Sequence, residues 1–227
     1  MTSKAEPIRR EVKRLLDYLS EAELALYSNE VSMTSHRVSF HSHSPGTPFL
    51  IGEDSPTIDQ YLSWVEAGQY SAILLDGSLL QMTYHFDEQD VTGHRLAYVP
   101  CPYEIEPTVL ASGDAIGDVV RDLLDSAPLL RSPIRFDFDA ANAGPDHPAA
   151  HFTINSARCR IACIAAMHPM RFADFVFRNF YNDYWQVHTD FFKQGSRRHL
   201  RRGTLTFADR EHPHFMWEQD PIAQDVQ

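Results

Sequence analysis

Alternation of apolar and polar residues through residues 132–163 limits the fold of this chain more than any other sequence feature. In residues 134–139, with the sequence IRFDFD, a strand turns the three apolar side chains to one face of a sheet. Arg135, Asp137 and Asp139 then share the opposite face. The pattern predicts a sheet with one apolar face toward a core and one charged face.

Two further runs predict strands beside the first. Residues 151–155, HFTIN, alternate again and place His151 on the polar side. Residues 158–163, RCRIAC, follow so closely that a tight two-residue turn is the simplest connection between the two runs. The three runs are therefore expected to be strand neighbours.

The register of that turn decides which charges meet. With a two-residue turn, Asn155 lies opposite Arg158, and Thr153 lies opposite Arg160. Both arginines then join the face that carries His151. One sheet face is therefore expected to gather arginines, carboxylates and a histidine.

The rest of the chain predicts helices around this sheet. Apolar residues at helical spacing indicate an opening helix from Pro7 to near Ser28. Asp76-Gly77 between two strand-like runs indicates a hairpin with a primed turn, which requires positive φ angles. The other expected elements are strands at 38–41, 70–75, 78–86, 94–99, 204–207 and 215–217, and helices at 55–65, 112–124 and 167–191, the last with a stripe of aromatic residues packed in the core. This succession predicts an α+β fold with a mainly antiparallel sheet flanked by helices.

Length and composition indicate a globular protein. With 227 residues, of which 43% are hydrophobic, the chain can bury a sizeable core. We expect a single domain over residues 1–227, with possible subregions 1–110 and 111–217 and a mobile acidic tail at 218–227. No apolar run is long enough to cross a bilayer, and the N-terminus lacks the apolar centre of a secretory signal, so a cytoplasmic location is expected.

The charge balance restricts nucleic-acid binding to local surfaces. A formal net charge of −11 argues against binding with the whole surface, because phosphate contact needs clustered lysine and arginine. A basic cluster does occur at Arg197, Arg198, Arg201 and Arg202. These arginines are either a nucleic-acid contact or a solvated helix end that compensates the helix dipole.

Cysteine and histidine spacing gives little sign of a metal site outside the central strands. Cys101, Cys159 and Cys163 are odd in number and form no CxxC pair, so we expect them to be reduced and buried. His41 and His43, at i and i+2, are either metal ligands on one strand face or surface histidines at a turn.

Common catalytic motifs are missing from the sequence. The chain has neither GxGxxG nor GxxxxGK[ST], which argues against a self-contained ATPase, and it has no GxSxG or HExxH. A histidine-x-threonine tripeptide occurs at His151 to Thr153, but phosphoesterases of that type need two facing copies. The lysine of the commonest nuclease pattern is also absent, since only three lysines occur and none completes it.

The charged sheet face is the remaining candidate for chemistry. Carboxylates and imidazoles there are suited to a divalent ion such as Mg²⁺ or Mn²⁺, with Asp137, Asp139, His147 and His151 as the candidate ligands. Arginines bind phosphate bidentately, so the candidate catalytic set is Asp137, Asp139, His151, Arg135 and Arg160. The alternative is a ladder of ion pairs across the strands that needs no ligand.

The wording of several segments resembles a bacterial family catalogued as a domain of unknown function. The resemblance extends from about Tyr70 to Phe192. It is carried by HRLAYVPCP at 94–102, IRFDFD at 134–139, HPAAH at 147–151, RCRI at 158–161 and the helix at 172–181. Proteins like it are encoded beside helicases in phage-defence operons, which implies a helicase partner, with DNA reached through that partner. The family supplies no catalytic residues to carry over.

Two functions of different class remain open. In the first, the chain is the effector of a helicase-linked defence pair, a metal-dependent nuclease that uses the charged face. In the second, it is a non-catalytic subunit that binds and regulates the helicase through its basic cluster and exposed aromatic residues.

Overall fold

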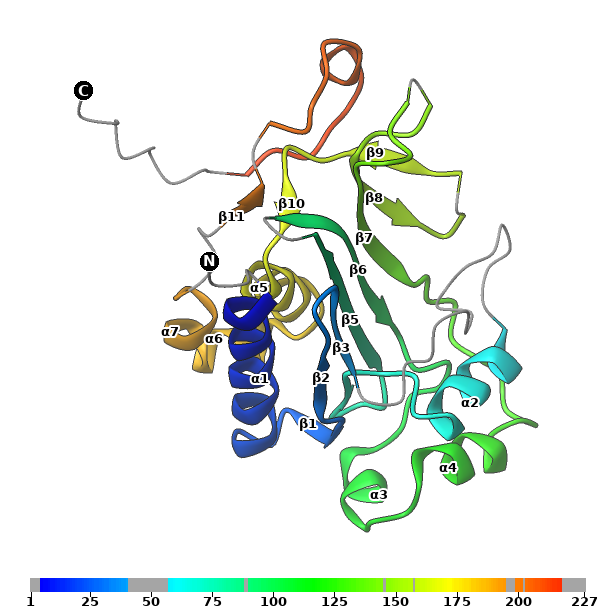
Figure 1. Ribbon diagram of the computed structural model, residues 1–227. Coiled ribbons are helices and arrows are strands. Elements are labelled where there is room, and N and C mark those ends of the chain that lie inside the picture. Colours follow the sequence, from blue (N-terminus) through cyan, green and yellow to red (C-terminus); the bar gives the residue numbers. More distant parts are fainter. Residues whose placement is uncertain are drawn as a thin grey trace.

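The structure is a computed structural model, and it describes residues 5–40, 57–87, 90–144, 146–156, 158–194, 199–201 and 203–217 (Figure 1). The helices are α1 (Ala5–Glu21), α2 (Ile58–Glu66), α3 (Pro107–Ala111), α4 (Ile116–Asp122), α5 (Pro169–Phe180), α6 (Asn182–Val187) and α7 (Thr189–Phe192), with a 3-10 turn, η1 (Ala208–Glu211). The strands are β1 (Ala25–Ser28), β2 (Val31–Met33), β3 (Arg37–Phe40), β4 (Ala72–Leu74), β5 (Leu79–Phe86), β6 (Val91–Val99), β7 (Ile134–Asp139), β8 (Ala150–Ile154), β9 (Arg160–Ala162), β10 (Ala166–Met167) and β11 (His199–Arg201).

One large antiparallel sheet organises the molecule. Its main path runs β1-β4-β5-β6-β7-β8-β9, and the β2-β3 hairpin joins it through β5. Strands β4 to β9 follow one another in sequence, each antiparallel to the next. The expected α+β fold with a mainly antiparallel sheet is confirmed.

Helices α1 and α5 lie side by side and cover one face of this sheet (Figure 1). The buried residues of α1 recur every three or four positions, as in Val12, Leu15 and Leu19, so one stripe of the helix meets the core. Phe172 and Val176 of α5 are fully buried in the same core. The apolar sides of β5 to β8 complete it.

A second, smaller core lies at one end of the opposite sheet face. Helices α2 and α4 contribute Trp64 and Val120, and the strands contribute Ile73 and Val99. Thr57 begins α2 with a capping box, in which its hydroxyl accepts from the Gln60 backbone N–H. The charged part of this face lies on β6 to β9, beyond this second core. None of the helices in the described part of the chain is long and apolar enough to span a membrane.

The opening helix is shorter than the sequence predicts. It ends at Glu21, because Glu23 adopts a left-handed φ of 57° and the Leu24 N–H returns to the Leu19 carbonyl. The apolar residues that continued the helical pattern belong instead to β1 (Ala25–Ser28), which pairs with β4.

The expected helix at 167–191 is divided into α5, α6 and α7. It breaks at Tyr181, which has φ −134° and whose hydroxyl donates to Asp76 at 2.8 Å. Around the break the stripe leaves the core in part, since Phe180, the last residue of α5, is 46% exposed and Val187, the last residue of α6, is 78% exposed. The predicted core packing of the stripe therefore holds for Phe172, Val176 and Phe191 but not for its exposed members.

The β4-β5 hairpin turns differently from the expected primed turn. Only Gly77 has a positive φ, of 85°; its N–H donates to the Leu74 carbonyl at 2.9 Å, and the Leu74 N–H donates to Ser78 at 2.7 Å. The loop is thus one residue longer than predicted, with glycine in the left-handed position.

Other differences lie near the chain ends and in short elements. Helix α3 was not expected, and residues 204–207 form no strand; Phe215 instead makes an isolated parallel bridge to Cys163. The three cysteines are free as expected, but Cys159 is exposed rather than buried. Residues 218–227, expected to be a mobile tail, lie outside the described residues.

The turn at Gly77 gives a stability test. A Cβ there would lie 2.9 Å from Cδ1 of Ile116 and 3.2 Å from Sγ of Cys101, in a left-handed backbone conformation. We expect Gly77→Ala to lower the free energy of unfolding by about 2 kcal/mol, as measured by urea denaturation. Gly113→Ala is the matched control, because Gly113 has φ +92° but no atom within 4 Å of the position that a Cβ would take. Equal losses for both variants would contradict the proposed packing of Gly77 against α4.

Candidate functional site

The charged strands place their polar side chains in two rows that run across the sheet. In the first row, Arg95 of β6, Asp137 of β7 and His151 of β8 are direct cross-strand neighbours. The second row lies two residues along the same face, as alternation requires. It consists of Arg135 of β7, Thr153 of β8 and Arg160 of β9.

Asp137 is the centre of the first row. Its side chain is 6% exposed, and both of its oxygens bind arginine: Nε of Arg95 donates to Oδ1 at 3.0 Å, and Nε of Arg135 donates to Oδ2 at 2.5 Å. Burial is the largest single influence on the pKa of Asp137 and raises it, but the charges of Arg135 and Arg95 together outweigh burial and hold the pKa below its ordinary value. Asp137 is therefore a buried carboxylate in an ion-pair network.

His151 completes the first row as a neutral group. Its Nδ1 lies 2.8 Å from the Pro148 carbonyl oxygen, and its Nε2 lies 3.5 Å from Oδ2 of Asp137. Burial lowers the pKa of His151, although Asp137 acts in the opposite direction. A carbonyl oxygen can only accept, so Nδ1 carries the proton of the neutral ring. The lone pair of Nε2 then faces the Asp137 carboxylate, and the two groups do not form a hydrogen bond.

The second row combines two charges with an unpaired hydroxyl. Thr153 is 6% exposed, and its Oγ1 is buried and has no hydrogen-bond partner in the described part of the chain. Arg135 is mostly buried, and burial lowers the pKa of its guanidinium. Arg160 is exposed. The two rows together hold three arginines and one carboxylate.

The predicted pairing of Thr153 with Arg160 is confirmed, whereas Asn155 and Arg158 lie outside the paired strands β8 and β9. Strand β8 ends at Ile154, because Asn155 adopts a left-handed φ of 62° and turns the chain. Arg158 consequently belongs to the turn and is exposed.

Asp139 and His147 lie at the end of the charged face and serve the loop there. Asp139 accepts from the side-chain amide of Asn142 at 2.7 Å and from its backbone N–H at 3.2 Å. His147 forms a bridge with Gly144, and its ring centroid lies 4.9 Å from that of His151. Asp139 is thus engaged by its own turn and is not hydrogen-bonded to Asp137.

The donor set of this face does not fit a divalent cation. Both oxygens of Asp137 are bound by guanidinium groups, whose positive charge opposes a second cation at the same carboxylate. Within the described ranges, no group of three or more His, Cys, Asp or Glu side chains is arranged to hold a metal ion. Mg²⁺ or Mn²⁺ binding by Asp137, Asp139, His147 and His151 stays a prediction, and the geometry favours an anion instead.

Several predicted residues cannot be placed. Arg197, Arg198 and Arg202 lie outside the described residues, as do His41 and His43. Arg201 ends β11, where its backbone pairs with Ala166 of β10, but its side chain is not described. Nucleic-acid contact by this basic cluster remains a prediction.

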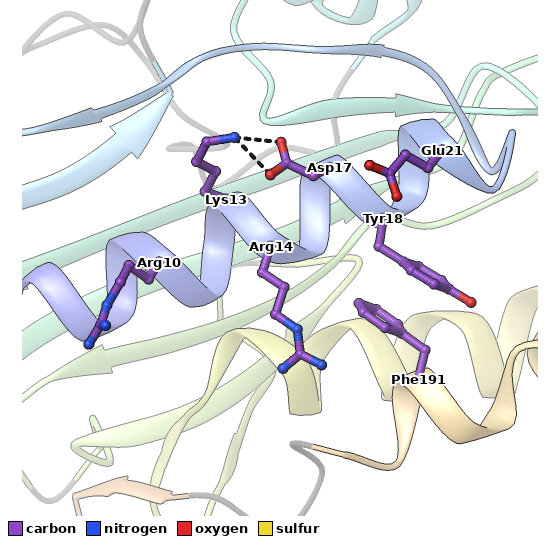
Figure 2. A pocket seen from close by; sticks show the side chains of 7 residues that line it. All are labelled: Arg10, Lys13, Arg14, Asp17, Tyr18, Glu21 and Phe191. Carbon is purple, nitrogen blue, oxygen red and sulfur yellow. Dashed lines mark hydrogen bonds and ion pairs between the residues drawn. The ribbon is translucent and has the colours of Figure 1, made fainter.

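A hollow beside α1 offers no competing site (Figure 2). Lys13 reaches Asp17 at 2.7 Å, and the Arg14 guanidinium lies 5.5 Å from the ring centroid of Phe191, which stacks on Tyr18. Arg14 also donates to Gln194. Lys13 and Arg14 of this hollow are therefore both engaged by neighbouring side chains.

Arg95 is the member of the site that sequence reasoning missed. Alternation in residues 94–99 places it on the face opposite Leu96 and Tyr98, but only the register of β6 against β7 brings it to Asp137. A signal was available, since Arg95 is the arginine of the strand expected at 94–99, yet its pairing with Asp137, 42 residues away, could not be predicted from the spacing.

Comparison with known proteins identifies the family. A family model described as an uncharacterized conserved protein, DUF2290, matches residues 22–217. The chain belongs to the DUF2290 family. The matched range contains the whole sheet and both rows, so the charged face is part of the family's domain. No curated protein and no solved structure matches the chain.

Asp137 gives a prediction about stability. Asp137→Asn leaves Arg95 and Arg135 without their carboxylate in a buried setting, so we expect the free energy of unfolding to fall by about 3 kcal/mol. Chemical denaturation measures the change. Asp139→Asn is the control, since Asp139 serves an exposed turn, and its loss should be about 1 kcal/mol or less. A loss no larger for Asp137→Asn than for the control would show that the buried pairs contribute little.

His94, on the core side of β6, predicts acid sensitivity. Its Nε2 accepts from the Met167 N–H at 2.7 Å, and burial lowers its pKa to about 4. The unfolded chain takes up this proton near pH 6.5 and the folded chain does not, so stability falls as the pH drops from about 6.5 toward 4, by up to about 1.4 kcal/mol per pH unit. Denaturation across this range should show a shallower slope for His94→Gln than for the wild type. Identical slopes would exclude His94 as the cause.

Proposed function

We propose that this DUF2290 protein is a non-hydrolytic subunit of a helicase-linked anti-phage system, and that its charged sheet face contacts the phosphates of nucleic acid. One observation carries the choice over the nuclease: both oxygens of Asp137 are bound by arginine, in a face with three arginines and one buried carboxylate. A metal-dependent nuclease needs carboxylate oxygens directed at cations. Arginines in excess suit anionic phosphate.

The wider context of the proposal comes from the resemblance to proteins encoded beside helicases in phage-defence operons. A helicase partner delivers single-stranded nucleic acid, which explains how a chain with a net charge of −11 meets a polyanion. The arginine rows then act as a local positive surface. Such a role belongs in the cytoplasm, where phage nucleic acid enters.

The test combines assembly with cleavage. The chain is purified with its neighbouring helicase, and cleavage of single- and double-stranded DNA and of RNA is measured with Mg²⁺ or Mn²⁺ and ATP. We expect the two proteins to form a stable complex. We also expect that any cleavage seen with Mg²⁺ or Mn²⁺ is unchanged when residues of the charged face are replaced.

Two variants decide between the classes of function. His151→Gln and Asp139→Asn remove candidate metal ligands without breaking the Arg95 and Arg135 ion pairs. Cleavage by the wild-type pair that either variant abolishes, at unchanged folding, would overturn the proposal and support a nuclease. Failure of the chain to associate with the helicase would overturn the partner assignment.

A further inference from the structure

We infer that the second row, Arg135, Thr153 and Arg160, is a binding subsite for a single phosphate group of a nucleic-acid strand. The inference deepens the proposed function and rests on it for the identity of the ligand. It starts from Thr153, whose hydroxyl oxygen is buried without a hydrogen-bond partner in the part of the chain that the structure describes. A buried hydroxyl without a partner costs free energy, so its retention calls for an explanation.

The position of Thr153 supplies that explanation. It lies directly between two arginines, with Arg135 opposite it on β7 and Arg160 opposite it on β9. Directly opposed residues of neighbouring strands have Cβ atoms about 5 Å apart, so a single phosphate group over the row would be within reach of all three side chains once the hydroxyl is uncovered. A hydroxyl donates a hydrogen bond to a phosphate oxygen, and the arginines supply charge.

The two arginines contribute in different ways. Arg135 is fixed, because its Nε binds Asp137 and its side chain is only 12% exposed. Arg160 is exposed at the sheet edge. Because the hydroxyl is covered, a ligand reaches it only when a neighbouring side chain moves, and Arg160 is the exposed member of the row. The row thus joins a buried, ion-paired cation to an exposed one.

Asp137 does not cancel this charge. Asp137 is shared between Arg95 of the first row and Arg135 of the second. The direct cross-strand neighbour of Arg160 is Thr153, which is not a carboxylate. Arg160 also lowers the pKa of His151 and of Arg135, which shows that its positive charge acts on both rows. The second row is therefore the more positive of the two.

The test uses the isolated full-length chain, so it does not depend on the helicase. Fluorescence anisotropy measures binding of a labelled single-stranded DNA oligonucleotide, and calorimetry measures binding of inorganic phosphate. We expect Thr153→Val, which replaces the hydroxyl by a methyl group of the same shape, to weaken oligonucleotide binding about tenfold while leaving stability unchanged or higher. Arg160→Gln should weaken it about tenfold as well.

Arg158→Gln is the matched control, because Arg158 is exposed on the adjoining turn and its replacement removes the same charge. It should change binding by less than about twofold, as expected for a screened surface charge. Equal effects of Arg158→Gln and Arg160→Gln, with Thr153→Val unchanged, would overturn the subsite in favour of general electrostatic attraction. Absence of oligonucleotide binding by the wild type would overturn it as well.

The phosphate arm separates the two sources of the ligand. Binding of the oligonucleotide much tighter than inorganic phosphate, with both weakened by Thr153→Val, supports a nucleic-acid strand. Equal affinity for both would overturn the strand as the ligand and assign the row to free phosphate. Loss of the helicase complex, by contrast, affects only the proposed function.

Discussion

The sheet is covered on one face by a continuous core, and the buried charged groups of its other face pair with one another. Water cannot solvate a carboxylate that is 6% exposed, so Asp137 depends on the guanidinium groups of Arg95 and Arg135. Arg135 lies on β7 beside Asp137, whereas Arg95 lies on β6, so the Arg95–Asp137 pair joins the two strands in their observed register. The charge network therefore favours the observed alignment of β6 with β7 as well as setting the chemistry of the surface.

The same constraint separates the two rows. In the first row, the positive charges are matched by a carboxylate and the histidine is kept neutral by burial. In the second row, Arg135 stands on β7 where the first row has Asp137, Thr153 stands on β8 where the first row has His151, and Arg160 adds a further positive charge. The first row is therefore an ion-pair network. The second row, two residues along the same strands, is positively charged and contains the Thr153 hydroxyl, which has no hydrogen-bond partner among the described residues.

Local patterns made much of this predictable. Alternation located β7 with its observed bounds, placed Arg135 and Asp137 on one face, and gave the pairing of Thr153 with Arg160. These features depend on the two-residue period of a strand and on short connections, both of which are visible in the sequence.

What could not be predicted depends on contacts between distant segments. Arg95 reaches Asp137 only through the pairing of β6 with β7, and the apolar residues after Glu21 became β1 because β4 was available as a partner. The long aromatic helix broke at Tyr181, whose hydroxyl binds Asp76 of a distant hairpin. In each case a tertiary interaction outweighed the local preference.

The outer edge of the sheet at β9 shows how a small contact protects a large structure. The Phe215 N–H donates to the Ala162 carbonyl at 2.8 Å, and the Ile164 N–H donates to the Phe215 carbonyl at 3.0 Å, so a late segment of the chain occupies part of the edge. A free strand edge is a template for another chain. The C-terminal segment therefore limits self-association by backbone pairing, and its loss would expose the strand that carries Arg160 to intermolecular β-sheet growth and aggregation.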